Sequence, residues 1–573
     1  MNKRIGIILV VVAVVAAAGF YVLNVSKKED AGSYAAFLPQ DTLATVSLTH
    51  LNKISDTFAD SPLGHLLAKE TMGGILNELQ VDGQAVATYD KTYDDMVALM
   101  NNPAFLSVFG DDTALAVLSP DLARLKGEPQ REIERSMVVF ATTAVSGALD
   151  SFAKLIMSDT VTTEVIDNVT LTKIEVSDGE VIYGVAAKGT VLLSYAPQTI
   201  VACLTAAESE VTLENAASFL AAKQYWQSIE AETVYSRMFV NSDALMSLLA
   251  RAEEDEISSI AKYLEGITYF SSLTYQLGQD LHSDSRAGFE PGKLHPALQA
   301  ALEQQVEANT SLNLLNENTL IYDWSSSLSA EVMLHSFAAG DEQELDQFDT
   351  VIQQELGLSF AQLLQAIGPQ YGFVVNQIVN SGFFPLPKVV AFVEVRDSTQ
   401  ATAVFNTIRE KINQTGFAEE KTVEANGQTV YYWSVLPGEA TQLAMVLTPT
   451  MLYAANGKSV LVDLLNQGGA LTMIGAPVAA SLGDALKNQV EAAGLGTFIV
   501  YPARLANELQ DVAGWLVSTL AATQGVSASR LGEEIINLML AYEVVAMTTK
   551  LTPEHGDWHC TIKNKQPVAA TEN

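Results

Sequence analysis

Three short patterns in this sequence contain residue types that could do chemistry. Ser151 and Lys154 have the spacing of the S-x-x-K pair of serine enzymes, in which the serine attacks an acyl group. The residue between them that would face the core of a helix is Phe152, and no K-T-G motif follows. The pattern is therefore typical of a packing helix, and we rank a serine hydrolase last among the possible functions.

The other two patterns suggest a phosphate loop and a metal site. Gly457-Lys458-Ser459 resembles the end of a phosphate-binding loop, but Leu452 stands where the first glycine belongs, so we predict a hairpin or a strand-to-helix turn at Asn456-Gly457. His555, His559 and Cys560 lie close in sequence. On an extended strand, however, residues four apart are separated by about 13 Å, too far to share one ion. We expect no metal, no cofactor and no enzymatic activity.

The element that must position Ser151 is a strand followed by a helix, and the chain contains it twice. Met137–Ile156 reads as an apolar strand, a turn and an amphipathic helix, and Val389–Ile408 repeats the pattern. Phe140 matches Phe392, and Phe152 matches Phe405. Matched segments keep the same order at separations of about 250 to 275 residues. We therefore predict an internal duplication.

Strand patterns dominate each copy, and their period of two with tight turns predicts antiparallel pairing. We expect an α+β fold with two tandem, pseudo-symmetric copies of a mainly antiparallel sheet, following one N-terminal transmembrane helix. Leu106–Gly110 is read as the start of a strand, and Ile267–Leu277 as the last strand of the first copy. We expect the anchor and tether to span residues 1–33, the first copy 34–292 and the second copy 312–566. A helical joint at 293–311 connects the copies, and a tail follows at 567–573.

The N-terminus predicts a membrane anchor. Ile5–Leu23 is 19 residues without a charge, which is about the length of one bilayer-spanning helix. A cleaved signal peptide with its site at Ala16–Ala18 is the alternative. Lys3 and Arg4 precede the segment, and the positive-inside rule puts them in the cytoplasm and the rest of the chain outside. We expect a single-pass membrane protein whose ectodomain lies outside the cytoplasm.

Composition limits the partners. The chain of 573 residues has a formal net charge of −35, which repels nucleic acid phosphates. The charge either keeps the protein soluble or forms an acidic face for a basic partner, and Glu253–Glu256 is read as a solvated helix face. Cys203 and Cys560 are the only cysteines. They are either two thiols or, in an oxidising compartment, one disulfide.

One loop and one short motif complete the prediction. Phe383, Phe384, Pro385 and Leu386 form an aromatic, proline-rich connection in the second copy, which either plugs the interface between the copies or lies exposed as a contact loop. Leu38–Thr42 reads LPQDT. After a membrane anchor, and at the start of a duplicated ectodomain, this motif resembles the DUF3352-type bacterial envelope proteins. The resemblance implies a location in the bacterial inner membrane with a periplasmic ectodomain, and it implies the fold, but no catalytic residues.

Together these features favour a non-enzymatic, membrane-tethered binding or scaffold protein of the bacterial envelope. A carrier or chaperone that holds a lipid or another apolar ligand in the ectodomain is the alternative. The expected partner is an envelope protein or an apolar ligand, in addition to the inner membrane reached through Ile5–Leu23.

Overall fold

A computed structural model shows that the chain divides into two compact units, Met1–Leu294 and His295–Asn573. The structure describes residues 33–51, 58–109, 112–142, 149, 161–176, 180–209, 211–251, 264–303, 308–327, 347, 349–354, 357–380, 385–434, 438–467, 474–510, 512, 514 and 525–565. The expected anchor Ile5–Leu23 lies outside these ranges, and within them no helix is both long and apolar enough to span a bilayer.

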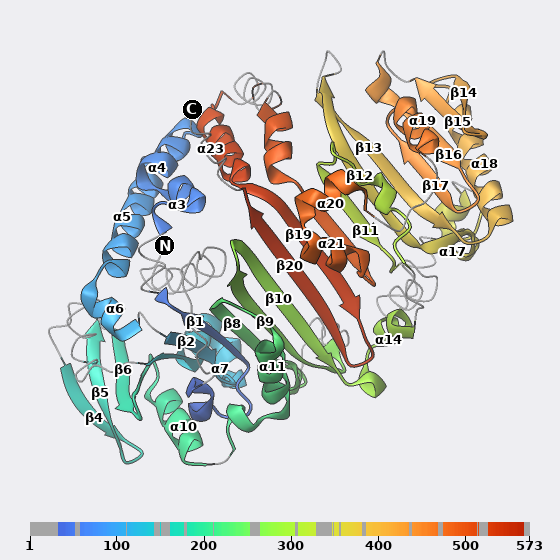
Figure 1. Cartoon of the computed structure of the whole chain (residues 1–573). Coiled ribbons are helices and arrows are strands. Elements are labelled where there is room, and N and C mark those ends of the chain that lie inside the picture. The colour runs from blue at the N-terminus through green and yellow to red at the C-terminus, as the bar shows by residue number, and fades with distance from the viewer. Residues whose placement is uncertain are drawn as a thin grey trace. The chain divides into compact units, whose positions relative to one another are not determined.

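The first unit is built on an antiparallel sheet with the strand order β10-β9-β8-β1-β2-β3-β7-β6-β5-β4 (Figure 1). The strands are β1 Ala44–Thr49, β2 Asp112–Val117, β3 Met137–Thr142, β4 Val161–Ile166, β5 Val169–Val176, β6 Glu180–Ala187, β7 Thr190–Ser194, β8 Thr233–Asn241, β9 Ile267–Leu277 and β10 Asp280–Phe289.

Helices cover one face of this sheet because alternate strand residues are apolar. Helices α10 (Pro197–Glu208) and α11 (Ala217–Ser228) enclose a core with Phe140 and Phe239. The rings of Phe219 and Phe239 meet edge to face with centroids 5.1 Å apart. Such aromatic pairs stabilise a core beyond the area they bury.

The other described helices of the first unit precede β1, lie in the connections between strands, or follow β10. They are η1 Ser33–Phe37, α3 Pro62–Leu67, α4 Lys69–Glu78, α5 Gly83–Met100, α6 Pro103–Phe109, α7 Leu122–Gly127, α8 Pro129–Ser136, η2 Leu213–Asn215, α12 Ser242–Leu249 and η3 Pro291–Lys293.

The second unit has a sheet with the strand order β20-β19-β18-β11-β12-β13-β17-β16-β15-β14, again antiparallel throughout. The strands are β11 Ile321–Ser325, β12 Ile367–Asn380, β13 Pro385–Val395, β14 Glu420–Ala425, β15 Gln428–Ser434, β16 Gln442–Leu447, β17 Met451–Ala455, β18 Gly496–Val500, β19 Tyr542–Leu551 and β20 His555–Asn564.

Both faces of the second sheet carry helices. One face packs on a large core with α19, α20 and α21, and part of the other packs on α17 and α18. The helices are α14 Pro296–Glu303, η4 Leu312–Leu314, α17 Phe360–Ala366, α18 Ser398–Gln414, η5 Glu439–Thr441, α19 Lys458–Asn466, α20 Ala476–Leu482, α21 Asp484–Glu491 and α23 Ser529–Leu540.

The strands have the same order in the two sheets. Strands β11 to β20 of the second sheet take the positions of β1 to β10 in the first. The registers also correspond at the centre. Phe140 of β3 lies opposite Ala114, and Phe392 of β13 lies opposite Gly372. A Cβ atom at Gly372 would lie 2.0 Å from the carbonyl oxygen of Asp323 and 2.8 Å from the Phe392 ring, so this position needs glycine.

The α+β class with antiparallel sheets is confirmed, and two predictions about single elements were wrong. Ile267–Leu277 is not the last strand of its unit, because β10 pairs with it through a tight hairpin. Residues 106–109 belong to helix α6, and the next strand begins at Asp112. Apart from Leu149, the helix predicted over 147–156 lies outside the described residues, whereas its counterpart is α18.

Candidate binding site at the base of a hairpin arm

Strands β12 and β13 are 14 and 11 residues long, and they extend beyond their neighbours. In the described part of the chain, β11 pairs with β12 only up to Val375, and β17 pairs with β13 only from Val390. Residues 377–380 and 385–388 therefore pair with each other alone, and we call them the arm. Figure 1 shows this hairpin reaching past the ends of the adjacent strands.

The arm resists strand addition along its edges. Pro385 and Pro387 lack the amide hydrogen that an added strand would need. A register shift between Val375 and Gln377 interrupts the ladder where the arm begins, and such bulges turn an edge away from new partners. The amide of Ile378 donates to Glu508 Oε2 at 3.1 Å. Contacts to the arm must therefore be made by side chains.

Asn456 fastens the base of the arm to the sheet. Its Oδ1 accepts a hydrogen bond from the amide of Val389 at 2.9 Å, and its Nδ2 donates to the carbonyl of Pro387 at 2.5 Å. The residue directly follows β17, so its side chain continues the ladder where the strand has ended. The arm thus leaves the sheet at a fixed point.

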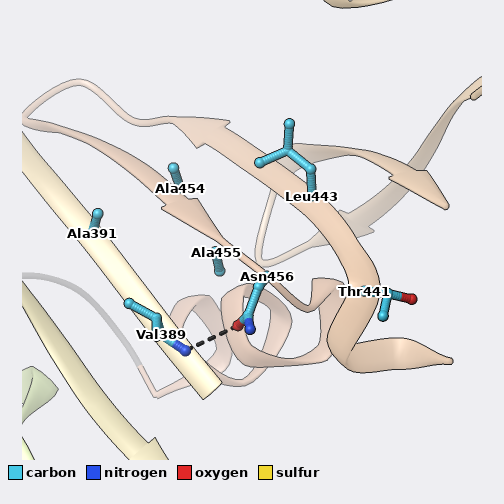
Figure 2. A pocket seen from close by; sticks show the side chains of 7 residues that line it. All are labelled: Val389, Ala391, Thr441, Leu443, Ala454, Ala455 and Asn456. Carbon is cyan, nitrogen blue, oxygen red and sulfur yellow. Dashed lines mark hydrogen bonds between the residues drawn. The ribbon is translucent and has the colours of Figure 1, made fainter. Parts of the chain in front are cut away.

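An apolar hollow of about 410 Å³ lies beside this point (Figure 2). It is lined by Val389, Ala391, Thr441, Leu443, Ala454, Ala455 and Asn456, which come from β13, η5, β16 and β17. Only Thr441 and Asn456 bring polar side chains to it. Its size is within the range of sites that hold small apolar groups or side chains.

The same sheet face remains apolar beyond the hollow. Phe373 lies opposite Ala391 in the ladder, and Tyr371 lies opposite Val393, so both aromatic side chains share the face of the hollow. Both are exposed, as is Leu443. Asp323 pairs with Phe373 on this face, and burial raises the pKa of its carboxyl group. The exposed aromatic residues and Leu443 define what we call the apolar face.

A second hollow, of about 470 Å³ and mixed polarity, lies on the opposite side of the arm's base. Val390 lines it, and successive residues of a strand point to opposite faces, so it lies behind the apolar hollow. Its charged side chains are Lys388, Asp463 and Glu317. Its polar lining is completed by amide and hydroxyl side chains of Asn313, Asn316, Asn318, Asn376, Gln377, Ser459 and Gln467.

The sequence located this region only in part. Pro385 and Leu386 of the predicted contact loop are the first residues of β13 and are half-buried. Phe383 and Phe384 lie outside the described residues. The two hollows and the role of Asn456 were not anticipated, and the Asn456-Gly457 turn was their only sequence signal.

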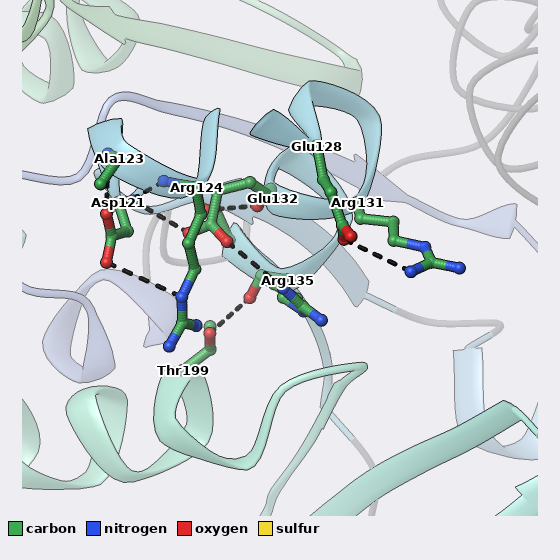
Figure 3. A network of polar contacts seen from close by, with 9 residues as sticks. Asp121, Ala123, Arg124, Glu128, Arg131, Glu132, Arg135 and Thr199 are labelled. Carbon is green, nitrogen blue, oxygen red and sulfur yellow. Dashed lines mark hydrogen bonds and ion pairs between the residues drawn. The ribbon is translucent and has the colours of Figure 1, made fainter. Parts of the chain in front are cut away.

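In the first unit, two helices occupy the connection between β2 and β3, which corresponds to the arm. Instead of an arm, α7 and α8 join β2 to β3, and Figure 3 shows their polar contacts. The buried Glu132 accepts a hydrogen bond from the amide of Asp121 at 2.9 Å. Thr199 of α10 donates to the carbonyl of Arg135 at 2.5 Å. The first contact holds α7 and α8 together, and the second binds the connection to α10.

The segment Gly457-Lys458-Ser459, which resembles the end of a phosphate-binding loop, lies at the start of helix α19. Gly457 is its N-cap, and the amide of Ser459 donates to Glu439 Oε1 at 3.2 Å. Lys458 Nζ lies 4.6 Å from the centroid of the Tyr432 ring. A carboxylate of the chain itself therefore accepts a hydrogen bond from the first turn of α19, and the segment is a strand-to-helix turn between β17 and α19.

Those remaining candidates that the structure describes do not come together in one site. His555 and Cys560 lie on β20, with His555 Nδ1 3.3 Å from Asp557 Oδ2, and no metal-like group of three His, Cys, Asp or Glu side chains occurs among the described residues. Cys203 is a buried thiol, and burial raises its pKa to about 12. Cys560 is a partly exposed thiol. Ser151, Lys154 and Glu253–Glu256 lie outside the described residues.

No protein-family model and no curated protein matches this chain. A solved structure described as "Structure of crystal form III of TP0453" aligns with 49% of this chain and 90% of its own chain, at 7% sequence identity and a TM-score of 0.21. A likeness at that TM-score supports no conclusion about fold or function.

Proposed function

We propose that this chain is a non-enzymatic, membrane-tethered binding or scaffold protein of the bacterial envelope, with its ectodomain in the periplasm. Ile5–Leu23 supports the tether, and the basic residues before it support the orientation. The two units are two diverged copies of one domain. The common strand order and the corresponding registers of Phe140 and Phe392 support this duplication. The LPQDT segment at Leu38–Thr42 adds the resemblance to DUF3352-type proteins.

The observation that carries the binding function is the apolar face at the base of the arm. Two aromatic side chains, Tyr371 and Phe373, and the aliphatic Leu443 are exposed around a hollow with few polar groups. Exposed apolar patches of this kind mark interaction sites on soluble domains, because leaving them in water costs free energy. The partner is an apolar segment of another envelope protein, seated beside the rigidly fixed arm.

Site-specific photo-cross-linking in intact cells tests this site. A photoreactive amino acid at Leu443 should give one discrete protein adduct on illumination. The same amino acid at Ala403, exposed on α18, is the matched control and should give none. A smear identical at both positions, or no protein adduct at Leu443, would contradict the proposal.

The tether has its own test. The full chain should stay with the membrane fraction after high-salt and carbonate washing, because about 19 apolar residues bind the bilayer hydrophobically. Recovery of a soluble form that begins near Gly19 would refute the anchor and support cleavage after Ala16–Ala18.

The alternative, a carrier of a lipid or another apolar ligand, is favoured by the apolar lining of the hollow in Figure 2. Native mass spectrometry of the purified ectodomain separates the two. A co-purifying lipid mass, or a lipid adduct at Leu443, would favour the carrier, whereas a discrete protein complex would favour the scaffold. A serine-reactive probe that labels Ser151 would overturn both in favour of a hydrolase.

A further inference from the structure

Strand β4 forms an exposed edge of the first sheet. Among the described residues it pairs only with β5, from Val161 opposite Ile174 to Ile166 opposite Val169. Val165 is 67% exposed and Val161 is 44% exposed. Figure 1 shows β4 at the margin of the unit. An edge strand presents its outward amide and carbonyl groups as a template for another strand.

The composition of β4 favours strand addition. Its sequence, VTTEVI, has β-branched residues at every position except Glu164 and contains no proline, glycine or lysine. These are the residues that usually protect an edge. Alternate side chains give the edge two different faces, one with Val161 and Val165 and the other with Glu164.

The equivalent edge of the second sheet is protected. Strand β14 pairs with β15 in the register in which β4 pairs with β5, and glutamates 420 and 424 stand where β4 has its two exposed valines. Glu420 Oε1 also lies 2.6 Å from Arg409 Nη2 of α18. Two edges with the same place in their sheets therefore differ in whether they admit another strand.

Charge identifies the kind of strand that fits β4. Residues 161–190, which form the outer strands of this sheet, contain five carboxylates and two lysines. Lys173 lies 3.9 Å from Glu175, and Lys188 donates to the carbonyl of Ala207. The local field is therefore negative. A second copy of the chain would bring two such segments together on molecules of −35 each, which disfavours self-pairing.

We propose that the β4 edge binds an extended, basic segment of a partner protein by strand addition. Main-chain hydrogen bonds provide the affinity, and alternate side chains provide the specificity. A lysine or arginine on one face of the added strand meets Glu164, and an aliphatic residue on the other meets Val161 and Val165. The surface belongs to the first unit and does not depend on the arm, so its failure would leave the proposed function of the second unit standing.

A synthetic probe tests the proposal with the full chain. The probe is a fluorescent, end-blocked eight-residue peptide of alternating lysine and valine, and its binding is followed by fluorescence anisotropy. Binding should slow hydrogen exchange over residues 161–166. The same peptide N-methylated on the amides of one edge keeps its charge but cannot complete the ladder, so it should bind at least about tenfold more weakly.

Two double variants separate strand addition from simple attraction between charges. Val161→Glu with Val165→Glu copies the β14 pattern and should weaken binding at least about tenfold, although it adds two negative charges. Val211→Glu with Leu220→Glu adds the same charges at other exposed apolar positions and should not weaken binding. The proposal is overturned if the probe does not bind, if the methylated peptide binds equally well, or if both double variants behave alike. Self-association that only the β4 variant abolishes would make a second copy the occupant and would also overturn it.

Discussion

Replacing Asn456 with alanine should loosen the base of the arm. The substitution removes two hydrogen bonds, from the amide of Val389 and to the carbonyl of Pro387. Each bond contributes about 0.5–1.5 kcal/mol net, and an amide that loses its partner adds a desolvation cost when it is buried. Asn456 and Val389 are half-buried, so water offsets part of that cost. We therefore expect the opening of the arm to become easier by about 2 kcal/mol.

Hydrogen exchange of the full chain measures this change where it occurs. A change of 1.4 kcal/mol is a factor of ten, so the amides in peptides spanning 385–391 should exchange roughly 30-fold faster in the Asn456→Ala variant. Asn466→Ala is the matched control, because this asparagine is exposed at the end of α19 and its loss should cost less than about 0.5 kcal/mol. If exchange in Asn456→Ala stays within about threefold of the wild type, strand pairing alone holds the arm.

Three further outcomes follow from the structure. Phe405→Ala should lower the free energy of unfolding by about 3–5 kcal/mol, since the ring is buried, whereas Thr402→Ala on the exposed side of α18 should change it by less than about 0.5 kcal/mol in urea unfolding. Cys203, with a pKa raised to about 12 by burial, should react with iodoacetamide only after unfolding, and rapid labelling of Cys203 in the native chain, distinguished from labelling of the partly exposed Cys560 by peptide mass, would contradict its position. The hydrogen bond from Arg409 lowers the pKa of Glu420, so its stabilising effect is present at neutral pH and lost as the pH falls through the lowered value. Glu420→Gln should therefore unfold more easily than the wild type at pH 7, with the difference vanishing in acid, as thermal unfolding across pH would show.

Much of the sheet could be predicted because its signals are local. The tight turn between β4 and β5 contains Asp167 and Asn168, residue types that tolerate a left-handed backbone, and their φ values are 49° and 66°. The Asn426-Gly427 turn, with φ of 46° and 74°, has the same chemistry at the equivalent hairpin. Strands with alternating apolar residues that are joined by such turns can bury their apolar face most simply by pairing as antiparallel hairpins.

Elements without local signals were missed. The sequence of β10, DLHSDSRAGF, has no apolar alternation, and its pairing with β9 along the strand determines its structure. Helix α6, PAFLSVF, was read as the start of a strand because it is short and apolar. It begins at Pro103, and its last residues, Val108 and Phe109, are buried in a small core. Length and apolarity alone do not separate buried helices from strands.

The candidate site could not be predicted because it is assembled across the sheet. Asn456 contacts Pro387, which is 69 residues away in the chain, and no spacing rule links an asparagine after one strand to a proline in another. The apolar hollow depends on strand order in the same way, since its lining comes from β13, β16 and β17. The composition of the loop predicted a contact region at the aromatic connection, but only the fold showed Asn456 and the apolar hollow at the base of the arm.

The differences between the two units bear on the choice between scaffold and carrier. In the first unit, α7 and α8 join β2 to β3, and among the described residues β4 pairs on one side only, with β5. In the second unit the connection becomes the arm, while Glu420 and Arg409 protect the corresponding edge at β14. Among the described residues, the first unit thus exposes a strand edge at β4, and the second unit exposes the apolar face beside the arm. A carrier needs one enclosed site for one ligand. Two surfaces with different chemistry, a main-chain edge in an acidic field and an apolar face beside an arm, suit a protein that holds two different partners at once, and they favour the scaffold.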